Sequence, residues 1–199
     1  MADTSKKNKS KLLDTLMIMI GLLLIAAAGV IMISQADFSK KQSAQTVVSA
    51  LEAIIPSCSR ALPEPRYGGG MPSAEIGGEN FVGLLKIERY NCVLPIGTVW
   101  DQEQIDRFPM VFSGNIYDRN LMIGGGNSEG QFDFVDEIEI GTSVKYLDLF
   151  GRVFWYEVSM VNHAESIDKI ESGEDDLTLF ARSKNTSKYV IIRCRLSNM

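Results

Sequence analysis

The sequence predicts a mainly β fold, a small closed barrel or sandwich of many short strands, preceded by an apolar helix and an amphipathic helix. Short apolar runs typical of strands recur from residue 80 to the end of the chain, and the run 144–149 alternates between apolar and polar residues. A long uninterrupted apolar run stands near the N-terminus. With 199 residues, the chain is expected to hold one domain with an appendage.

The apolar run covers residues 16–33, which carry no charged side chain. A helix of this length is roughly 27 Å long, close to the thickness of a bilayer core. We therefore expect a transmembrane signal-anchor over 12–33, with the lysine-rich tail 1–11 in the cytoplasm and the following domain outside the cell. A cleaved signal peptide is the alternative. The run is longer than a usual signal-peptide core, and no A-x-A-like site follows it.

Between this anchor and the β region, the sequence predicts an amphipathic helix over 34–55 and a Pro/Gly-rich linker over 56–79. The apolar stripe of the helix recurs with helical spacing. It is formed by Val47, Val48, Leu51, Ile54 and Ile55. Pro56 is expected to end the helix.

Seven apolar runs predict strands, and 80–199 is the predicted β-barrel domain. They are 81–87, 92–96, 120–123, 144–149, 153–161, 177–180 and 189–194. The turn residues 150–152 predict a hairpin between the fourth and fifth runs. Many short strands with little helix are typical of a small barrel or sandwich.

The composition excludes several classes of function. A net charge of −5 argues against a nucleic-acid-binding protein, which needs a basic face. Three cysteines and one histidine are too few for a zinc ribbon or a disulfide scaffold. We expect no cofactor and no metal site. Any site of the Ser-His-Asp or Cys-His type would have to use His163.

Four patches, in register, resemble the sortases, the membrane-anchored cysteine transpeptidases of Gram-positive bacteria, and class B-like members most of all. They are Gly83–Ile87 with Leu94–Ile96, Asn120–Asn127, Asp176–Arg182 and Tyr189–Cys194. A turn at Gly141 and Thr142 stands where the family has Gly-Asp. The resemblance implies a sortase-like closed barrel of about eight strands. It also implies a groove for the sorting-signal peptide of a surface protein or pilin.

Sortase chemistry needs a cysteine thiolate as nucleophile, a histidine as general acid and base, and an arginine that donates hydrogen bonds to the substrate. The resemblance places Gly126 at the histidine, Arg182 at the nucleophile and Tyr189 at the arginine. Glycine has no proton to donate, and a guanidinium cannot attack a carbonyl. Lys188 could replace the arginine only with a register shift, because neighbouring strand residues face opposite sides.

We therefore expect a catalytically inactive pseudo-sortase that binds or presents a peptide segment, or assists an active sortase. The expected groove residues are Asn120, Gly125, Asn127, Phe180 and Lys188. Arg182 is expected to point into this groove, where it would favour an acidic peptide. Two alternatives stay open. One is an active transpeptidase or hydrolase with a rearranged site, and the other is a structural scaffold whose groove is filled.

The rearranged site of the first alternative would use Cys92, Cys194 or His163. His163 is otherwise expected to be an exposed loop residue, and Cys194 a packed core thiol. Cys58 and Cys92 could form a disulfide outside the cell or remain free. The acidic residues within 171–176 lie near a loop that binds calcium in some sortases, although a solvated loop is the simpler interpretation. Trp100 and Trp155 are expected to be packing residues.

Overall fold

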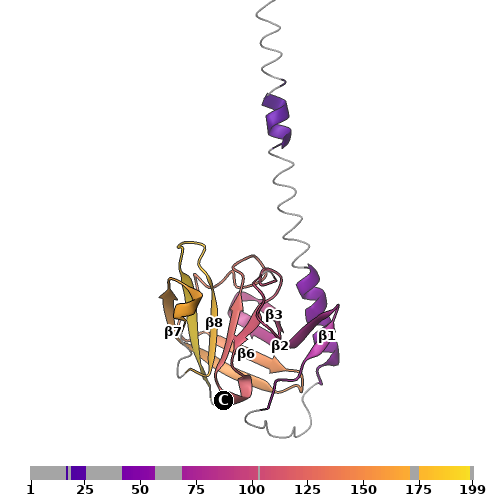
Figure 1. The fold of residues 1–199 in the computed structure, drawn as a ribbon, viewed down its shortest axis with the longest axis vertical. Coiled ribbons are helices and arrows are strands. Elements are labelled where there is room, and N and C mark those ends of the chain that lie inside the picture. Colours follow the sequence, from indigo (N-terminus) through magenta and orange to yellow (C-terminus); the bar gives the residue numbers. More distant parts are fainter. Residues whose placement is uncertain are drawn as a thin grey trace, which may run out of the picture. The chain divides into compact units, whose positions relative to one another are not determined.

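The computed structural model describes residues 17, 19–25, 42–56, 69–102, 104–170 and 175–197. The chain divides into two compact units, Met1–Lys40 and Lys41–Met199, and the second holds the β domain (Figure 1). In the first unit, residues 19–25 are helical. Among the described residues, no helix is long and apolar enough to cross a membrane. The span predicted over 12–33 lies mostly outside those residues and stays a prediction.

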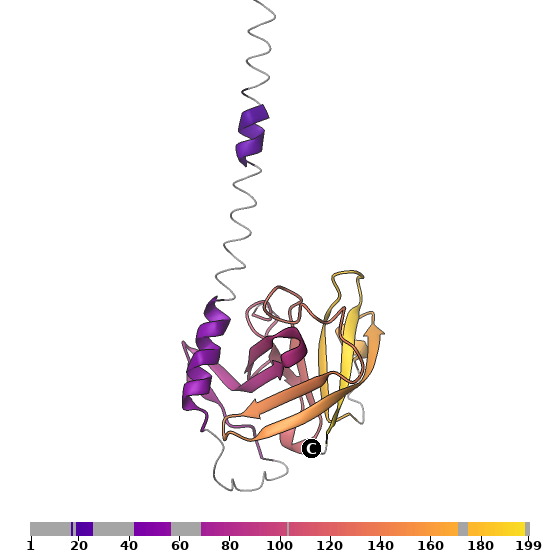
Figure 2. The ribbon, with the colours of Figure 1, turned by 180° about the vertical axis from the view of Figure 1, so that it is seen from behind.

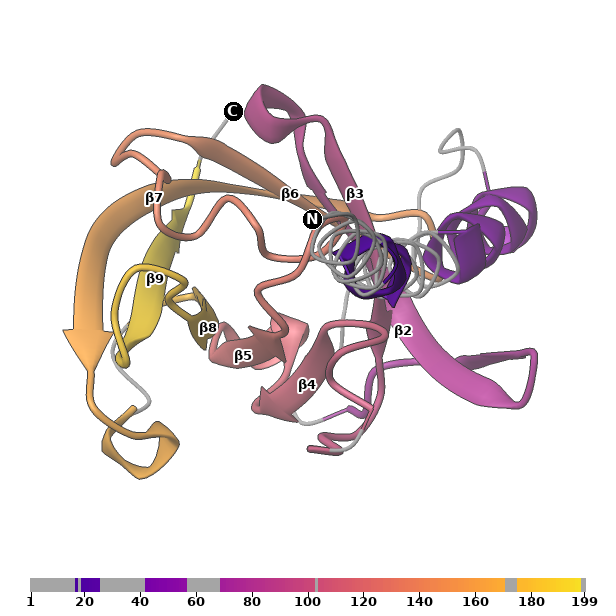
Figure 3. The same ribbon diagram turned by 90° about the horizontal axis from the view of Figure 1, so that it is seen from above.

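The β domain is one sheet of nine strands in the order β1-β2-β3-β4-β5-β8-β9-β7-β6. The bounds are Ala74–Ile76 (β1), Glu79–Ile87 (β2), Cys92–Gly97 (β3), Met110–Ser113 (β4), Leu121–Gly125 (β5), Ser143–Asp148 (β6), Val153–Ala164 (β7), Leu177–Arg182 (β8) and Tyr189–Leu196 (β9). A further pairing between β2 and β6 closes strands β2 to β9 into a barrel, seen from above in Figure 3. The predicted mainly β, closed barrel of about eight strands is confirmed.

The ninth strand, β1, lies outside the closed barrel because two strands share one edge of β2. β1 pairs with Glu79–Phe81 at the start of β2, whereas β6 pairs with Gly83–Lys86 further along. The seven runs predicted as strands are all strands. β1, inside the predicted linker 56–79, and β4 were not predicted, because three and four residues are too few to display an alternation.

Strand alternation sorts the apolar side chains into one cluster inside the barrel and two clusters outside it. The inner cluster includes Leu85, Phe132, Tyr146, Tyr156 and Ile192, each fully buried. One outer cluster lies between the barrel and the helix described next, and the other covers β5, β8 and β9. Burial of this apolar surface is the main force that holds the barrel together.

Residues 42–54 form the described part of the predicted amphipathic helix, which lies along one side of the barrel (Figure 2). The helix buries Val48 and Leu51 against Phe81 and Leu84 of β2. Ile54 was predicted on the same stripe, but its side chain is 55% exposed. The helix ends at residue 54, and the next residue, Ile55, is buried in the same cluster as Val48 and Leu51. Residues 34–41 lie outside the described ranges.

The predicted hairpin is confirmed, and its turn is built around the buried carboxylate of Asp148. One oxygen accepts hydrogen bonds from the backbone N–H groups of Phe150 and Arg152, at 2.9 and 2.8 Å. The other accepts from Arg152 Nε at 2.6 Å and from the Tyr117 hydroxyl at 3.0 Å. Burial, followed by the charge of Asp148, raises the pKa of Tyr117 to about 12. We call Tyr117, Asp148 and Arg152 the Asp148 cluster.

Candidate functional site

The three positions that the resemblance singled out meet at one end of three adjacent strands. Gly125 pairs with Ala181 across the parallel strands β5 and β8, so Gly126 lies beside the end of β8. Arg182 pairs with Tyr189 across β8 and β9. The Asn127 side chain ties the group together, since its Nδ2 donates to the Arg182 carbonyl at 2.7 Å. This juxtaposition was predictable only through the family resemblance.

Gly126 is enclosed by polar groups that leave little room for a side chain. Its N–H donates to Gln131 Oε1 at 3.1 Å. A Cβ at this position would lie 3.2 Å from both Asp106 Oδ1 and the Ile105 carbonyl oxygen, closer than side-chain carbons normally approach. The segment that precedes β4 therefore occupies space beside the position at which the resemblance places an imidazole.

In the segments that meet at Gly126, three buried amide atoms have no hydrogen-bond partner among the described residues. They are Gln104 Oε1, Asn127 Oδ1 and Gln131 Nε2. Gln131 is only 4% exposed. We call Gln104, Gly126, Asn127 and Gln131 the Gly126 end. The buried polar atoms of this region therefore make fewer hydrogen bonds than those of the turn around Asp148. A buried amide without a hydrogen bond costs free energy.

The Arg182 side chain was expected to point into a groove, but it is exposed to solvent, and it lines neither of the two clefts described below. Its neighbour Ala181 faces the barrel interior. Because successive side chains of a strand point to opposite faces, Arg182 points outward. Beyond Arg182, Asp136 accepts the Lys184 backbone N–H at 2.8 Å. Desolvation acts to raise the pKa of Asp136, but hydrogen bonds from Ser183, Lys184 and Asn127 hold it below its usual value.

Aromatic side chains cover the outer face of the sheet beside the Gly126 end. Trp100 packs 5.1 Å from Phe112 and 5.6 Å from Phe180, between ring centroids, and Phe180 packs 6.4 Å from Tyr189. We call these four residues the aromatic layer. A Cβ on Gly124 would lie 2.2 Å from the Trp100 ring and 2.6 Å from the Phe180 ring. Glycine at 124 therefore lets the indole lie directly on the backbone of β5, and the packing role predicted for Trp100 is confirmed.

The structure brings together some of the predicted groove residues but not all of them. Asn127 and Phe180 lie at the site, and Lys188 is an exposed residue of the adjoining β8–β9 turn. Asn120 precedes β5 at the opposite end from Gly126, where its Oδ1 accepts the Asn115 N–H at 2.8 Å. Gly125 faces the barrel interior, since a Cβ there would lie 2.8 Å from the Phe132 ring.

The residues of the rearranged-site alternative lie on three different strands. Cys194 is fully buried inside the barrel, as predicted, and burial raises the pKa of its thiol. Burial, and then the charge of Asp133, raises the pKa of Cys92 to about 12. His163 is exposed, as expected, but it belongs to β7 and not to a loop. The prediction for Cys58 concerns a residue outside the described ranges.

The described part of the acidic cluster holds two strands together. Asp175 accepts a hydrogen bond from Arg193 at 2.9 Å, and Asp176 accepts the Leu196 backbone N–H at 2.7 Å. Both contacts fix the start of β8 against the end of β9. Residues 171–174 lie outside the described ranges, so the calcium question stays open for them. Within the ranges that are described, no group of three His, Cys, Asp or Glu side chains could hold a metal ion.

Two clefts flank the Gly126 end. One of about 540 Å³ lies between the helix 42–54, β3 and the loop after β5, and its lining includes Cys92, Gln131 and Asp133. The other, of about 410 Å³, is lined in part by Trp100 and Gln104. The sequence did not predict that the clefts are lined by Trp100, Gln104 and Gln131, because none of these residues stands in a family motif.

No protein-family model and no curated protein sequence matches the chain. Solved sortase structures do match it. Sortase A of Listeria monocytogenes is 14% identical with a TM-score of 0.51, over 59% of this chain and 88% of that one. A sortase D5 transpeptidase of Clostridium perfringens is 16% identical with a TM-score of 0.52, over 59% and 79%. Sortase C of C. perfringens, solved with the C-terminal cell wall sorting motif, is 16% identical with a TM-score of 0.52, over 60% and 71%.

At these identities the similarity is one of fold. The chain has a sortase-like fold, as the motif resemblance implied.

Proposed function

We propose that this chain is a membrane-anchored sortase-fold protein of the cell envelope that carries out no transpeptidation and binds or presents an extended peptide segment. The observation that carries the proposal is the identity of three adjacent residues, Gly126, Arg182 and Tyr189, at the ends of β5, β8 and β9. The apolar run 16–33 supports the anchor and its orientation.

The inactivity follows from what these side chains can do chemically. Transpeptidation by a sortase requires a nucleophile that forms a thioacyl intermediate and a group that protonates the leaving amine. Gly126 has no side chain, and the Arg182 guanidinium is permanently charged and cannot add to a carbonyl. A Tyr189 hydroxyl can donate one hydrogen bond, but it carries no positive charge at neutral pH.

A peptide partner is supported by the fold. Sortase C of C. perfringens, which shares this fold, was solved with its C-terminal cell wall sorting motif. A barrel can keep a peptide-binding surface after it loses its reacting groups, because burial and strand pairing hold the fold in their absence.

The test compares the natural chain with Gly126→His/Arg182→Cys/Tyr189→Arg, against one library of sorting-signal peptides, for binding and for cleavage. A matched control carries Gly126→His/Arg182→Ser/Tyr189→Arg and lacks the thiol. We expect the natural chain to bind a peptide and cleave none. Cleavage by the natural chain would contradict the proposal, and melting curves of all three proteins show whether the tight packing at position 126 tolerates an imidazole.

A structural scaffold is the second candidate, and the aromatic layer favours it because this chain's own side chains cover the sheet. The test uses Trp100→Ala, which uncovers Gly124, with Val99→Ala as control, since Val99 is 72% exposed. If peptide affinity rises in Trp100→Ala but not in Val99→Ala, the first proposal is supported, because the indole then obstructs a peptide-binding groove. If neither the natural chain nor Trp100→Ala binds any peptide, and cross-linking recovers a stable envelope partner, the scaffold replaces the first proposal.

A further inference from the structure

The second half of β7 has a strand partner on one edge only. β6 pairs with β7 over Val153–Glu157, and the N–H of Gly141 then donates to the Val158 carbonyl at 2.8 Å. Beyond that point, Met160–Ala164 runs in unbroken register with β9 on the opposite edge. Within the described residues, no backbone hydrogen bond joins Met160–Ala164 to any other segment. Figure 3 shows this end of β7 extending beyond β6.

An unpaired edge presents backbone groups that can pair with another strand. Alternate residues of an antiparallel strand direct their N–H and C=O groups toward each edge, so part of Met160–Ala164 presents both groups away from β9. In the described part of the connection after β7, residues 165–170, no backbone hydrogen bond reaches this edge. Ile170, on that connection, packs with Ala164, Phe180 and Ile191 on the outer face of the sheet.

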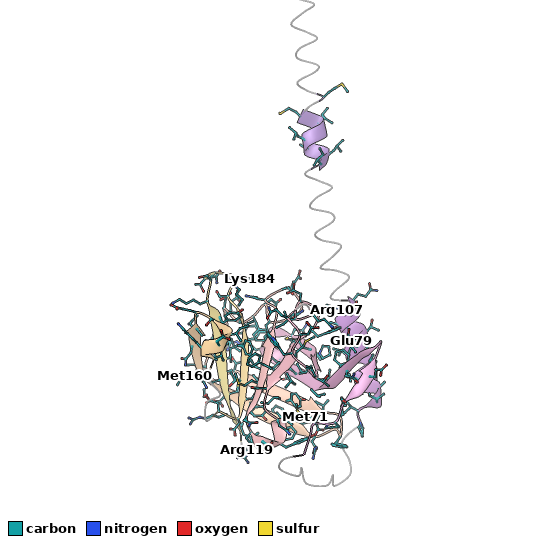
Figure 4. All side chains as sticks on the ribbon, viewed as in Figure 1. Met71, Glu79, Arg107, Arg119, Met160 and Lys184 are labelled. Carbon is teal, nitrogen blue, oxygen red and sulfur yellow. The ribbon has the colours of Figure 1, made fainter. Side chains whose placement is uncertain are left out.

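The edge also lacks the side chains by which proteins usually prevent strand pairing. Met160–Ala164 contains no lysine, arginine, carboxylate, proline or glycine. The pairing of β7 with β9 is interrupted only by a register shift between Val158 and Met160, just before this run begins. Met160 is 48% exposed and reaches the outer boundary of the domain (Figure 4). Ile140, which precedes the residue paired to Val158, is 68% exposed and adds a second apolar side chain near the same edge.

We propose that this edge pairs with the same edge of a second copy of the chain, antiparallel, about a two-fold axis at Asn162. A two-fold contact needs only one surface, which both copies supply. Two copies of a chain with net charge −5 repel each other on average, whereas this run carries no carboxylate and opposes no like charges. The pairing places Met160 beside Ala164 of the other copy and extends the sheet across the dimer. It does not rest on the proposed function.

Cross-linking of the full-length chain in detergent micelles tests the position of the axis. Asn162→Cys is introduced together with Cys58→Ser and Cys92→Ser, while the fully buried Cys194 is kept. Directly opposed residues of an antiparallel pair have Cα atoms about 4.5–5.5 Å apart, within the range that a disulfide bridges. The matched control is Val153→Cys, 44% exposed on the half of β7 that β6 covers. We expect a disulfide-linked dimer from Asn162→Cys at least tenfold more abundant than from Val153→Cys.

Sedimentation supplies the second measurement. We expect a concentration-dependent monomer–dimer equilibrium for the natural chain. It should be lost in Asn162→Lys, which places two like charges directly opposite each other at the axis, and kept in Val153→Lys. A natural chain that stays monomeric, with equal cross-linking of both cysteine variants, would overturn the proposal. So would a dimer that persists in Asn162→Lys, because another surface would then form it. If Asn162→Lys fails to fold by circular dichroism, the comparison of the two cysteine variants is the deciding test.

Discussion

Two polar regions of this barrel, the Asp148 cluster and the Gly126 end, are satisfied very differently. The Asp148 carboxylate is 1% exposed and accepts four hydrogen bonds, two from backbone N–H groups and two from side chains. At the Gly126 end, one amide atom each of Gln104, Asn127 and Gln131 is buried without a partner among the described residues. Among the described residues, the first region is the better hydrogen-bonded of the two, and we expect it to contribute more to the stability of the fold.

This difference in hydrogen bonding indicates that the fold depends more on the Asp148 cluster than on the Gly126 end. The Asp148 cluster joins the β6–β7 turn to Tyr117, which precedes β5 in the chain, so it holds two distant segments in place. Gly126 has no side chain, and the Arg182 side chain makes no comparable hydrogen bond between distant described segments. Their strands are held by backbone pairing, β5 with β8 and β8 with β9. A barrel built in this way can lose the reacting groups at one end while the other end keeps its shape.

The largest expected effect concerns Cys92, whose thiol lies 3.8 Å from the carbonyl oxygen of Gln131. With its pKa at about 12, against 9 for a free thiol, the thiolate fraction near pH 8 is roughly a thousandth of the ordinary value. In Cys58→Ser, iodoacetamide should label Cys92 about a thousandfold more slowly in the folded chain than in urea, as followed by mass spectrometry.

The labelling rate should rise with pH up to about 12. The folded pKa lies above the unfolded one, so the retained proton stabilises the fold below pH 9, and this contribution is lost as the pH rises from 9 to 12. Rapid selective labelling at neutral pH, with loss of a peptide-cleaving activity, would instead support the rearranged catalytic site.

Asp148→Asn should be the most destabilising single substitution in this comparison. It leaves Arg152, whose side chain is 15% exposed, without its carboxylate, and breaking such a pair costs about 3–5 kcal/mol. Urea denaturation measures the free energy of unfolding. The control is Glu165→Gln, which removes an exposed ion pair with Lys169 and should change stability by less than about 1 kcal/mol. Similar losses in both variants would show that the cluster has no special role.

Gly124→Ala should have an intermediate effect, because its Cβ would overlap the Trp100 and Phe180 rings. Over-packing of this kind costs about 1–3 kcal/mol. Gly70→Ala is the matched control, since a Cβ there meets nothing within 4 Å, and surface changes of this type stay within about 0.5 kcal/mol. A stable Gly124→Ala with unchanged near-ultraviolet circular dichroism would mean that the indole moves aside at little cost.

Gln131→Leu should have the smallest effect. The substitution removes the acceptor of the Gly126 N–H, but it also removes the unpartnered Nε2, and the net change should be about 1 kcal/mol or less. Thermal unfolding against the natural chain measures it. A loss comparable to that of Asp148→Asn would show that the Gly126 end is a built polar network, and the contrast between the two regions would fail.

Much of the fold could be predicted from the sequence because it depends on local pattern. Short apolar runs identified seven strands, and the turn at 150–152 identified the hairpin, since both signals arise from neighbouring residues. The strand pattern failed for β1 and β4, which are too short. The helical spacing failed for Ile54, whose side chain faces solvent. The motif resemblance singled out Gly126, Arg182 and Tyr189, and strand pairing explains why these three residues are adjacent.

The sequence by itself determined the residue types at the three positions that the motif resemblance assigns to the reacting groups, Gly126, Arg182 and Tyr189. Only the tertiary structure decided what surrounds those positions. Trp100 reaches Phe180 across eighty residues of chain, Asp106 approaches Gly126, and β6 leaves half of β7 uncovered. Contacts between segments so far apart depend on sheet closure and register, which no local pattern encodes.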